Sequence, residues 1–335
     1  MKRVDLSLLL SVVFLTLFGL FMIYDASSFI AFRDFNDKYH YLKNQFIWVI
    51  VGLFAMGFFS YFDYKKLHKL SLPILLVAIG LLFLVFVPGI GVHLLGASRW
   101  INLGFSLFQP AEFVKLALAI YLASWFSHKE KGRLVAFLLL LCLIVALVML
   151  EPDMGTTIVI LLEALIVYFL SGGNVAYLGA LAPVAAIIGY VLIAVSPYRL
   201  KRLQTFFNLD QTAVDTSYHV RQILIALGSG GIFGVGLGNS LQKYAYLPET
   251  TTDSIFAIIA EELGFVGAGA IIVIFMIIMW RGFVVATKAK DNFGKLLAAG
   301  IISFLAIQTI INLSAQTVLI PLTGIPLPFI SYGGS

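Results

Sequence analysis

Only one cysteine, Cys142, occurs among the 335 residues. It has no partner for a disulfide and no second soft ligand for zinc, so a disulfide framework and a cysteine zinc cage are both excluded. Charged residues are also scarce, at 12% of the chain against the roughly 25% of soluble domains. The net charge of +5 is small and spread along short loops. Nucleic-acid binding, coiled coil and disorder are therefore not indicated.

Apolar residues are what the chain has in excess. Hydrophobic side chains make up 61% of the sequence, against about 45–50% in soluble domains. A folded soluble chain of this length could not bury that much apolar surface, because its core takes up only part of it. The composition predicts a polytopic integral membrane protein.

Nine apolar runs approach the length of about 20 residues that a membrane-spanning helix needs. They are continuous rather than alternating, which favours an all-α architecture over a barrel. A tenth run begins near Pro328 and is cut off at Ser335, so ten transmembrane helices are expected, the tenth truncated. The nine are Leu6–Tyr24, Phe46–Tyr61, Leu70–Val87, Pro110–Phe126, Leu134–Leu150, Gly155–Ser171, Ala176–Ser196, Ser254–Trp280 and Leu296–Leu319.

Basic residues set the expected orientation, because cytoplasmic loops are enriched in lysine and arginine. With the N-terminus in the cytoplasm, twelve basic residues fall inside and only four fall in the short outer loops. The inner set is Lys2, Arg3, Lys65, Lys66, Lys69, Lys129, Lys131, Arg133, Arg281, Lys288, Lys290 and Lys295; the outer set is Arg33, Lys38, Lys43 and Arg99. The N-terminus is therefore predicted to be cytoplasmic.

The connection 197–252, between the seventh and eighth spans, is then a large extracytoplasmic loop within a single transmembrane domain, 1–335. Its length marks it as functional or disordered, and the periodic stretch Val220–Leu227 favours a short amphipathic helix. The glycine-rich stretch 228–238 lacks the strand and the Gly-Lys-Ser/Thr ending of nucleotide-binding loops. No nucleotide or organic cofactor is expected.

Several charged residues lie inside predicted spans, where insertion is costly. Glu112 and Lys115 are three positions apart and share a helix face, which Gln109 extends. They could form a structural ion pair or line a substrate cavity. Glu163, Glu261 and Glu262 could belong to a proton path or make hydrogen bonds between helices.

Polar residues also gather in the outer loops. Arg99, beside Trp100, could meet an anionic head group or simply lie at the interface. Asp153, in the turn Glu151-Pro-Asp, could cap the next helix or, with Glu151, hold a divalent cation. Asp253 could likewise cap the helix that follows it or act as an acid at the mouth of a cavity. These alternatives stay open on residue chemistry alone.

Eight motifs, in order and over nearly the whole chain, resemble one family, the SEDS proteins (shape, elongation, division and sporulation). The stretch from Gly234 to Glu249 is more similar to the FtsW/SpoVE division branch than to the RodA branch. The motifs are Pro88-Gly-Ile-Gly-Val, Gly96-Ala-Ser-Arg-Trp-Ile, Gln109-Pro-Ala-Glu-Phe-Val-Lys, Glu151-Pro-Asp-Met-Gly-Thr, Ala226-Leu-Gly-Ser-Gly-Gly, Leu247-Pro-Glu with Thr252-Asp253, Glu261-Glu-Leu-Gly and Pro326-Leu-Pro-Phe-Ile-Ser-Tyr-Gly-Gly.

The resemblance implies a ten-helix peptidoglycan glycosyltransferase that polymerises lipid II on the outer face of the bacterial cytoplasmic membrane, at the division septum. Implied partners are a class B penicillin-binding protein that supplies the transpeptidase, other division proteins and membrane lipid. By motif match the essential acid falls on Asp253, and recurrent charged positions fall on Arg99, Glu112, Lys115, Asp153 and Glu249. The chain departs from the family pattern at Glu151, Thr251 and Ser254, and none of these departures removes the acid.

The implied chemistry suits the residues. A sugar hydroxyl attacks an anomeric carbon that carries a lipid pyrophosphate, which requires a base and a stabilising positive charge. Asp253 is the expected base. Arg99 and Lys115 are expected to stabilise the pyrophosphate, with Arg221 and Lys243 as further candidates. A divalent cation, Mg²⁺ or Mn²⁺, could assist them.

Two other classes of function remain open on the sequence. One is a flippase or proton-coupled transporter of a lipid-linked precursor, using Glu112, Lys115, Glu163 and Glu261. The other is a scaffold that only recruits the transpeptidase.

Overall fold

The computed structural model describes residues 4–94, 97–102, 104, 107–127, 134–207, 215–244 and 246–333. The chain divides into two compact units, each built from three segments. Unit 1 comprises Met1–Val49, Asn174–Ile278 and Gln308–Gly333, and unit 2 comprises Ile50–Gly173, Met279–Ile307 and Gly334–Ser335.

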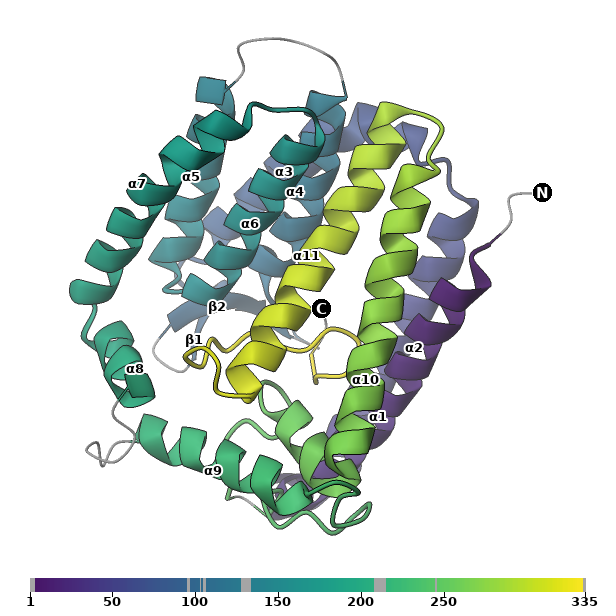
Figure 1. The fold of residues 1–335 in the computed structure, drawn as a ribbon, viewed down its shortest axis with the longest axis vertical. Helices are drawn as coiled ribbons and strands as arrows, with labels where there is room; N and C mark the ends of the chain where they lie inside the picture. The colour runs from purple at the N-terminus through teal and green to yellow at the C-terminus, as the bar shows by residue number, and fades with distance from the viewer. Residues whose placement is uncertain are drawn as a thin grey trace. The chain divides into compact units, whose positions relative to one another are not determined.

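Each of the nine predicted spans corresponds to one helix (Figure 1). Among the described residues, α1, α2, α3, α10 and α11 are long and apolar enough to cross a membrane. The fold is that of a polytopic, predominantly helical membrane protein. The helices are α1 (Leu6–Phe35), α2 (His40–Tyr61), α3 (Lys65–Leu84), α4 (Pro110–Phe126), α5 (Leu134–Leu150), α6 (Met154–Leu170), α7 (Val175–Ala194), α10 (Ile255–Thr287) and α11 (Asn292–Gln316).

Helix α1 differs most from its predicted bounds. It continues past Tyr24 to Phe35 and ends at Asn36, whose left-handed backbone has φ 54°. The extension carries Asp25, whose carboxylate is paired with Lys243. A search for apolar runs stops at the first acidic residue. The helix continues through Asp25 because the charge of its carboxylate is paired.

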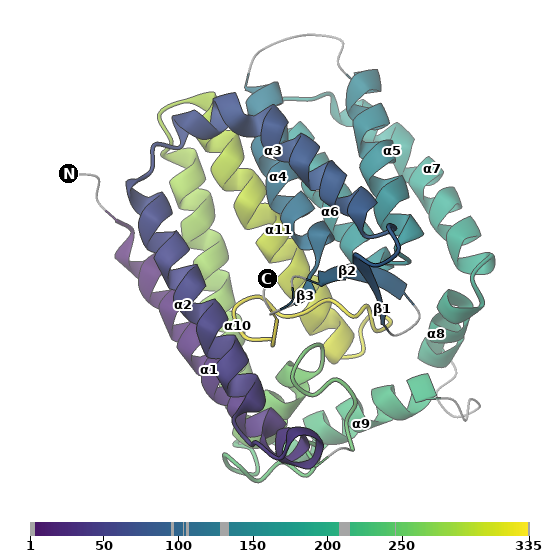
Figure 2. The ribbon, with the colours of Figure 1, turned by 180° about the vertical axis from the view of Figure 1, so that it is seen from behind.

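In unit 2, α4 packs against α3 and α6, and α5 packs against α6. A small antiparallel sheet in the order β1-β2-β3 adjoins α4 (Figure 2). Its strands are β1 (Gly91–Leu94), β2 (Ala97–Asn102) and β3 (Leu107–Phe108). The fold class remains all-α, as predicted, and this small sheet is an addition that places Arg99 on a strand instead of in a loop. The strands are too short to span a membrane, so a search for membrane-spanning segments does not detect them.

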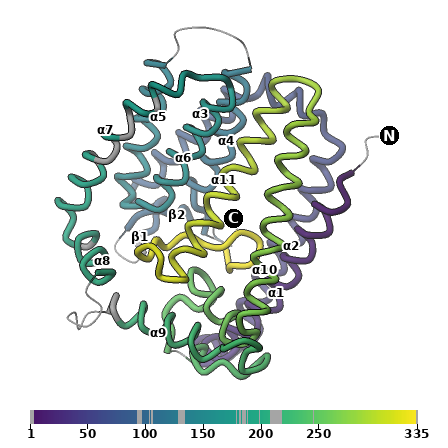
Figure 3. Tube along the Cα trace, viewed as in Figure 1, coloured from purple at the N-terminus to yellow at the C-terminus, as the bar shows by residue number. Residues whose placement is uncertain are grey.

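In unit 1, the predicted outer connection contains two helices, α8 (Pro197–Phe207) and α9 (Asp215–Gly230), which follow α7 along the trace in Figure 3. Helix α9 includes the predicted amphipathic stretch Val220–Leu227 and confirms it. The glycine-rich stretch then pairs with α10, where the backbone N–H of Val235 donates to the carbonyl of Glu261. Gly234 has φ +83°, and a Cβ there would lie 2.0 Å from the Glu262 carbonyl oxygen, so only glycine fits.

Residues after α11 form turns and extended chain up to residue 333. The tenth span that the sequence predicted from Pro328 is not seen within this described part. The segment instead packs on α1, because a Cβ at Gly19 would lie 2.5 Å from the Phe329 carbonyl oxygen. The basic inner loop, residues 128–133, lies outside the described residues.

Candidate functional site

Asp253 lies at the end of a tight loop, two residues before α10 begins at Ile255. The loop closes on Glu249, whose carbonyl accepts the backbone N–H groups of Thr252 at 3.2 Å and Ser254 at 3.1 Å. Glu249 has a positive φ of 52°, and its carboxylate accepts the Thr252 hydroxyl at 2.9 Å. Asp253 is half-buried and Glu249 is exposed. Ser254 lies between Asp253 and the first residue of α10, and the two roles that the sequence offered for Asp253 both stay predictions.

The backbone of this loop is held by the C-terminal part of unit 1. The carbonyl of Thr251 accepts the Tyr332 N–H at 2.8 Å, and that of Thr252 accepts the Ser331 hydroxyl at 2.6 Å. The carbonyl of Asp253 accepts the side-chain amides of Asn312 and Gln316. Three consecutive carbonyl groups are thus bound by residues about 60 or more positions away in the chain.

His219 of α9 also contacts this loop, and the sequence gave no signal for it. Its Nε2 lies 2.7 Å from the hydroxyl of the buried Ser254. Burial, helped by the charge of Arg202, lowers the pKa of His219 to about 4. The imidazole is therefore neutral at neutral pH. Arg221, two residues further along α9, is exposed.

A charged cluster in unit 1 links α1 and α10 through Lys243, which lies in the connection before α10. The ammonium of Lys243 bonds both oxygens of Asp25, at 2.9 and 3.0 Å, and Glu262 Oε1 at 2.9 Å. The hydroxyl of Ser240 donates to the neighbouring carboxylate of Glu261. Sequence analysis named Lys243 and both glutamates but missed Asp25, which is 218 residues from Lys243.

In unit 2, Glu112 and Lys115 form the ion pair that their spacing suggested, with Nζ and Oε1 2.7 Å apart. Lys115 is only 1% exposed, and its ammonium also lies 6.0 Å from the ring centre of Phe304. Glu163 of α6 is fully buried, and neither of its carboxylate oxygens has a hydrogen-bond partner in the described structure. The ion pair that the spacing suggested is present, and a role of this face toward substrate stays a prediction.

The turn between α5 and α6 uses its polar groups internally. Asp153 is the N-cap of α6 and accepts the Thr156 N–H at 3.0 Å, the Thr156 hydroxyl at 2.9 Å and the Gln109 amide at 3.1 Å. The predicted cap is confirmed. Arg99 of β2 donates to the carbonyls of Glu151 at 3.0 Å and Pro152 at 2.6 Å.

This turn does not fit a divalent cation. Burial, with the nearby charge of Asp153, raises the pKa of Glu151 to about 8, so this carboxyl is protonated at neutral pH. The oxygens of Asp153 are already engaged by Thr156 and Gln109. In the described part of the chain, no group of three or more acidic, histidine or cysteine side chains could hold a metal ion.

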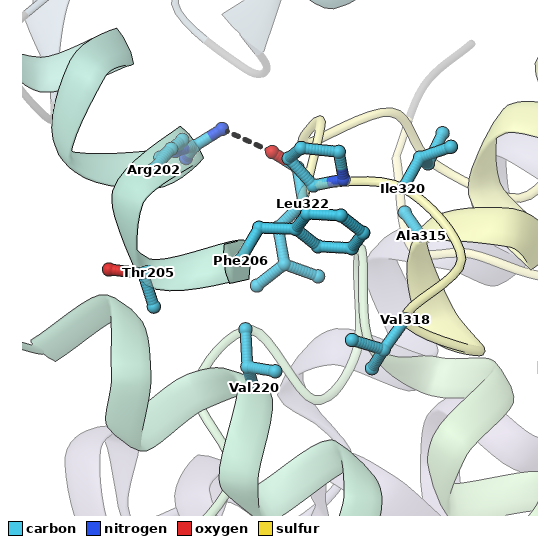
Figure 4. Close-up of a pocket in the computed structure, with 9 residues that line it drawn as sticks. Arg202, Thr205, Phe206, Val220, Ala315, Val318, Ile320 and Leu322 are labelled. Atoms are coloured by element: carbon cyan, nitrogen blue, oxygen red, sulfur yellow. Dashed lines mark hydrogen bonds between the residues drawn. The ribbon is translucent and has the colours of Figure 1, made fainter. Parts of the chain in front are cut away.

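A small apolar pocket in unit 1 lies between α8, α9 and the segment after α11 (Figure 4). Phe206, Val220 and Val318 line it, and Arg202 donates to the Leu322 carbonyl at 2.8 Å at its edge. Its lining carries little that could recognise a sugar or a pyrophosphate. It is not a candidate for the reaction centre.

Comparison with known proteins agrees with the motifs. The family model described as "Cell cycle protein", for FtsW, RodA and SpoVE, matches residues 6–335. The chain is 39% identical to stage V sporulation protein E of Bacillus subtilis, over 99% of this chain and 92% of that protein. It is 38% identical to the probable peptidoglycan glycosyltransferase FtsW of Geobacter sulfurreducens, over 100% of this chain and 91% of that protein.

Solved structures give the same result. A chain from a peptidoglycan synthase complex, studied for its coordination of polymerization and crosslinking, superposes with a TM-score of 0.81 at 25% identity, covering 100% of this chain and 94% of that one. The rod shape determining protein RodA of Thermus thermophilus shares the fold, with a TM-score of 0.72 at 24% identity over 100% of this chain and 92% of that one. The chain belongs to the FtsW/RodA/SpoVE family of cell cycle proteins.

Proposed function

We propose that this protein is a peptidoglycan glycosyltransferase that polymerises lipid II on the outer face of the bacterial cytoplasmic membrane. Support comes from full-length relatives that carry this activity in their names. The structural observation that carries the proposal is the half-buried acid Asp253, held in a loop whose backbone is bound on three consecutive carbonyls. A general base needs a fixed position of this kind.

In the proposed reaction, a sugar hydroxyl of one substrate attacks the anomeric carbon of another. The new bond is an oxygen–carbon glycosidic bond, and the bond that breaks joins the anomeric carbon to the undecaprenyl pyrophosphate, which leaves with its electron pair. The carboxylate of Asp253 accepts the hydroxyl proton. A single displacement inverts an α-linked donor to a β-1,4-linked product without a covalent enzyme intermediate.

The leaving pyrophosphate needs positive charge. Lys115 and Arg99 remain the proposed groups, with Arg221, exposed on α9, as a further candidate. Lys115 would have to exchange Glu112 for the substrate, and Arg99 would act from a guanidinium that already holds the α5–α6 turn. Lys243 is less suited, because two carboxylates already surround its ammonium.

Several finer features belong to the same proposal. They are ten membrane spans with a cytoplasmic N-terminus, a role at the division septum, and assembly with a class B penicillin-binding protein. The structure that resembles this chain at a TM-score of 0.81 comes from a peptidoglycan synthase complex, which supports such a partnership. Glu112, Glu249 and Asp153 remain proposed contributors to substrate binding.

The decisive experiment supplies purified protein with lipid II in detergent, with Mg²⁺, with Mn²⁺ and with EDTA. We expect glycan polymer, and the EDTA arm tests the expected divalent cation. Translocation of lipid II in vesicles without any polymer would replace the proposal with the flippase alternative. Binding of the transpeptidase with neither activity would leave a scaffold.

A further inference from the structure

The carbonyl group of Asp253 is bound in an unusual way. Backbone carbonyls near the start of a helix usually accept from the helix itself, as the carbonyl of Ser254 does from Ala257 at 3.0 Å. The carbonyl of Asp253 instead accepts from two side-chain amides of α11, Asn312 at 3.2 Å and Gln316. Two donors therefore converge on the one peptide oxygen that belongs to the proposed base.

Both amide side chains are committed to the protein interior. Asn312 and Gln316 are each 2% exposed. A buried polar group is costly unless it is hydrogen-bonded. The Asp253 carbonyl satisfies the amide N–H groups of Gln316, and it shares those of Asn312 with the Ile325 carbonyl. The carbonyl oxygen of Asp253 and the two side-chain amides therefore stabilise one another's positions.

The carboxylate of Asp253 lies close to the same part of the chain. A Cβ built on Gly324 would lie 3.4 Å from Asp253 Oδ2, so the chain after α11 passes near the acid. Gly324 has φ +74°, which strains any other residue. The segment 312–324 thus binds the carbonyl of Asp253 and passes near its carboxylate.

We propose that Gln316, together with Asn312, is a positioning residue for Asp253. Holding the carbonyl fixes the peptide plane after Asp253, and with it the direction in which the side chain leaves the backbone. The inference rests on the proposed function, since it assigns these amides to the base of that reaction. Displacement of a catalytic group by about 1 Å can lower a rate by ~10²-fold.

Substitution of Gln316 gives a more specific test of the inference than substitution of Asn312. Asn312 also donates to the Ile325 carbonyl at 2.7 Å, so its loss would disturb the chain after α11 as well. Gln308 is a matched control on the same helix: it is 4% exposed, and its amide donates to the Pro326 carbonyl at 3.1 Å. Gln316→Met and Gln308→Met each remove one buried amide of α11, but only the first removes a bond to Asp253.

The test measures kcat, KM and thermal midpoint for polymerisation of lipid II by the parent and both variants. We expect Gln316→Met to lower kcat by ~10-fold or more with KM within about twofold, since the base is displaced while the substrate contacts remain. Gln308→Met should keep kcat within about threefold at a similar thermal midpoint. Equal losses of kcat in both variants, or no loss in Gln316→Met, would overturn the inference.

Gln316→Glu extends the test if Gln316→Met fails to accumulate. Its shape is conserved, but its carboxyl can donate to the Asp253 carbonyl only when protonated. The ratio of its kcat to that of the parent should rise as the pH falls, and a pH-independent ratio would count against positioning. A parent that makes no polymer under any condition would instead refute the proposed function, whereas an active parent with a normal Gln316→Met refutes only the positioning role.

Discussion

Asp153 and Asp253 each precede an apolar helix, and the structure holds these two aspartates in opposite ways. At the Asp153 turn, the side chain does the binding: its oxygens accept two groups of Thr156 and the amide of Gln109. At the Asp253 loop, the backbone is bound instead, through Asn312 and Gln316 on the carbonyl. The side chain of Asp153 is a structural cap, whereas the position of Asp253 is set through its backbone carbonyl.

The same conservative change therefore distinguishes the two acids, and the largest effect is expected at Asp253. Asp253→Asn keeps the shape and the bound carbonyl but cannot accept the hydroxyl proton. We expect a folded protein that still binds the proposed transpeptidase partner and loses ~10²–10⁴-fold in polymerisation rate. Polymerisation of lipid II by purified variant and parent checks this, and activity within a few-fold of the parent would remove Asp253 from the mechanism.

The next largest effect is expected at Lys115, on α4, the helix that follows Gln109. Lys115→Met leaves Glu112 without its partner, and breaking a buried ion pair typically costs about 3–5 kcal/mol. The side chain of Glu112 is 19% exposed, so the lower end is expected. Thermal unfolding in detergent should show a loss that a second change, Glu112→Gln, recovers. A stable, inactive Lys115→Met that Glu112→Gln does not restore would assign the lysine to the substrate instead.

Substitution of Arg99 tests whether the contacts of the Asp153 turn serve only the stability of the fold. Its guanidinium donates to two carbonyls of the turn, and hydrogen bonds from a charged group contribute about 1.5–3 kcal/mol each. The site is partly exposed, so we expect Arg99→Ala to lose about 2 kcal/mol of stability. Comparing the thermal midpoint with turnover checks this. The family resemblance assigns Arg99 to the pyrophosphate, and a greater loss of turnover than of stability would support that role.

The membrane helices could be predicted from the sequence because hydropathy is local. Each of the nine longer apolar runs became a helix, and capping was one of the roles expected for Asp153 because its partner, Thr156, is three residues away. Contacts between distant residues carry no such signal. Asp25 and Lys243 are 218 residues apart, and Gln316 and Asp253 are 63 apart. The family motifs indicated Asp253, but only the fold shows what holds it.

Glu151 should make the Asp153 turn sensitive to pH. Its pKa is raised from 4.5 to about 8 in the folded protein, so both states are protonated below pH 4.5. Between pH 4.5 and about 8 the unfolded chain releases this proton while the folded protein keeps it, so stability falls as the pH rises. We expect Glu151→Gln to remove this decline. Thermal midpoints from pH 5 to pH 9 check it, and parallel curves for both proteins would show that Glu151 is not the group responsible.

The smallest effect is expected at Asp153, from the substitution that abolishes activity at Asp253. Asparagine caps a helix about as well as aspartate, at a cost of a few tenths of a kcal/mol. Its amide oxygen can still accept the Thr156 N–H, while the Thr156 hydroxyl and the Gln109 amide can each reverse their role and accept from the new NH₂ group. Asp153→Asn should therefore keep polymerisation within about threefold and shift the thermal midpoint by only a few degrees.

Asp153→Ala, which leaves all three donors without an acceptor, should cost about 1–2 kcal/mol. If Asp153→Asn were as inactive as Asp253→Asn while remaining equally stable, the contrast between the two acids would fail, and Asp153 would join the substrate site that the family resemblance assigned to it.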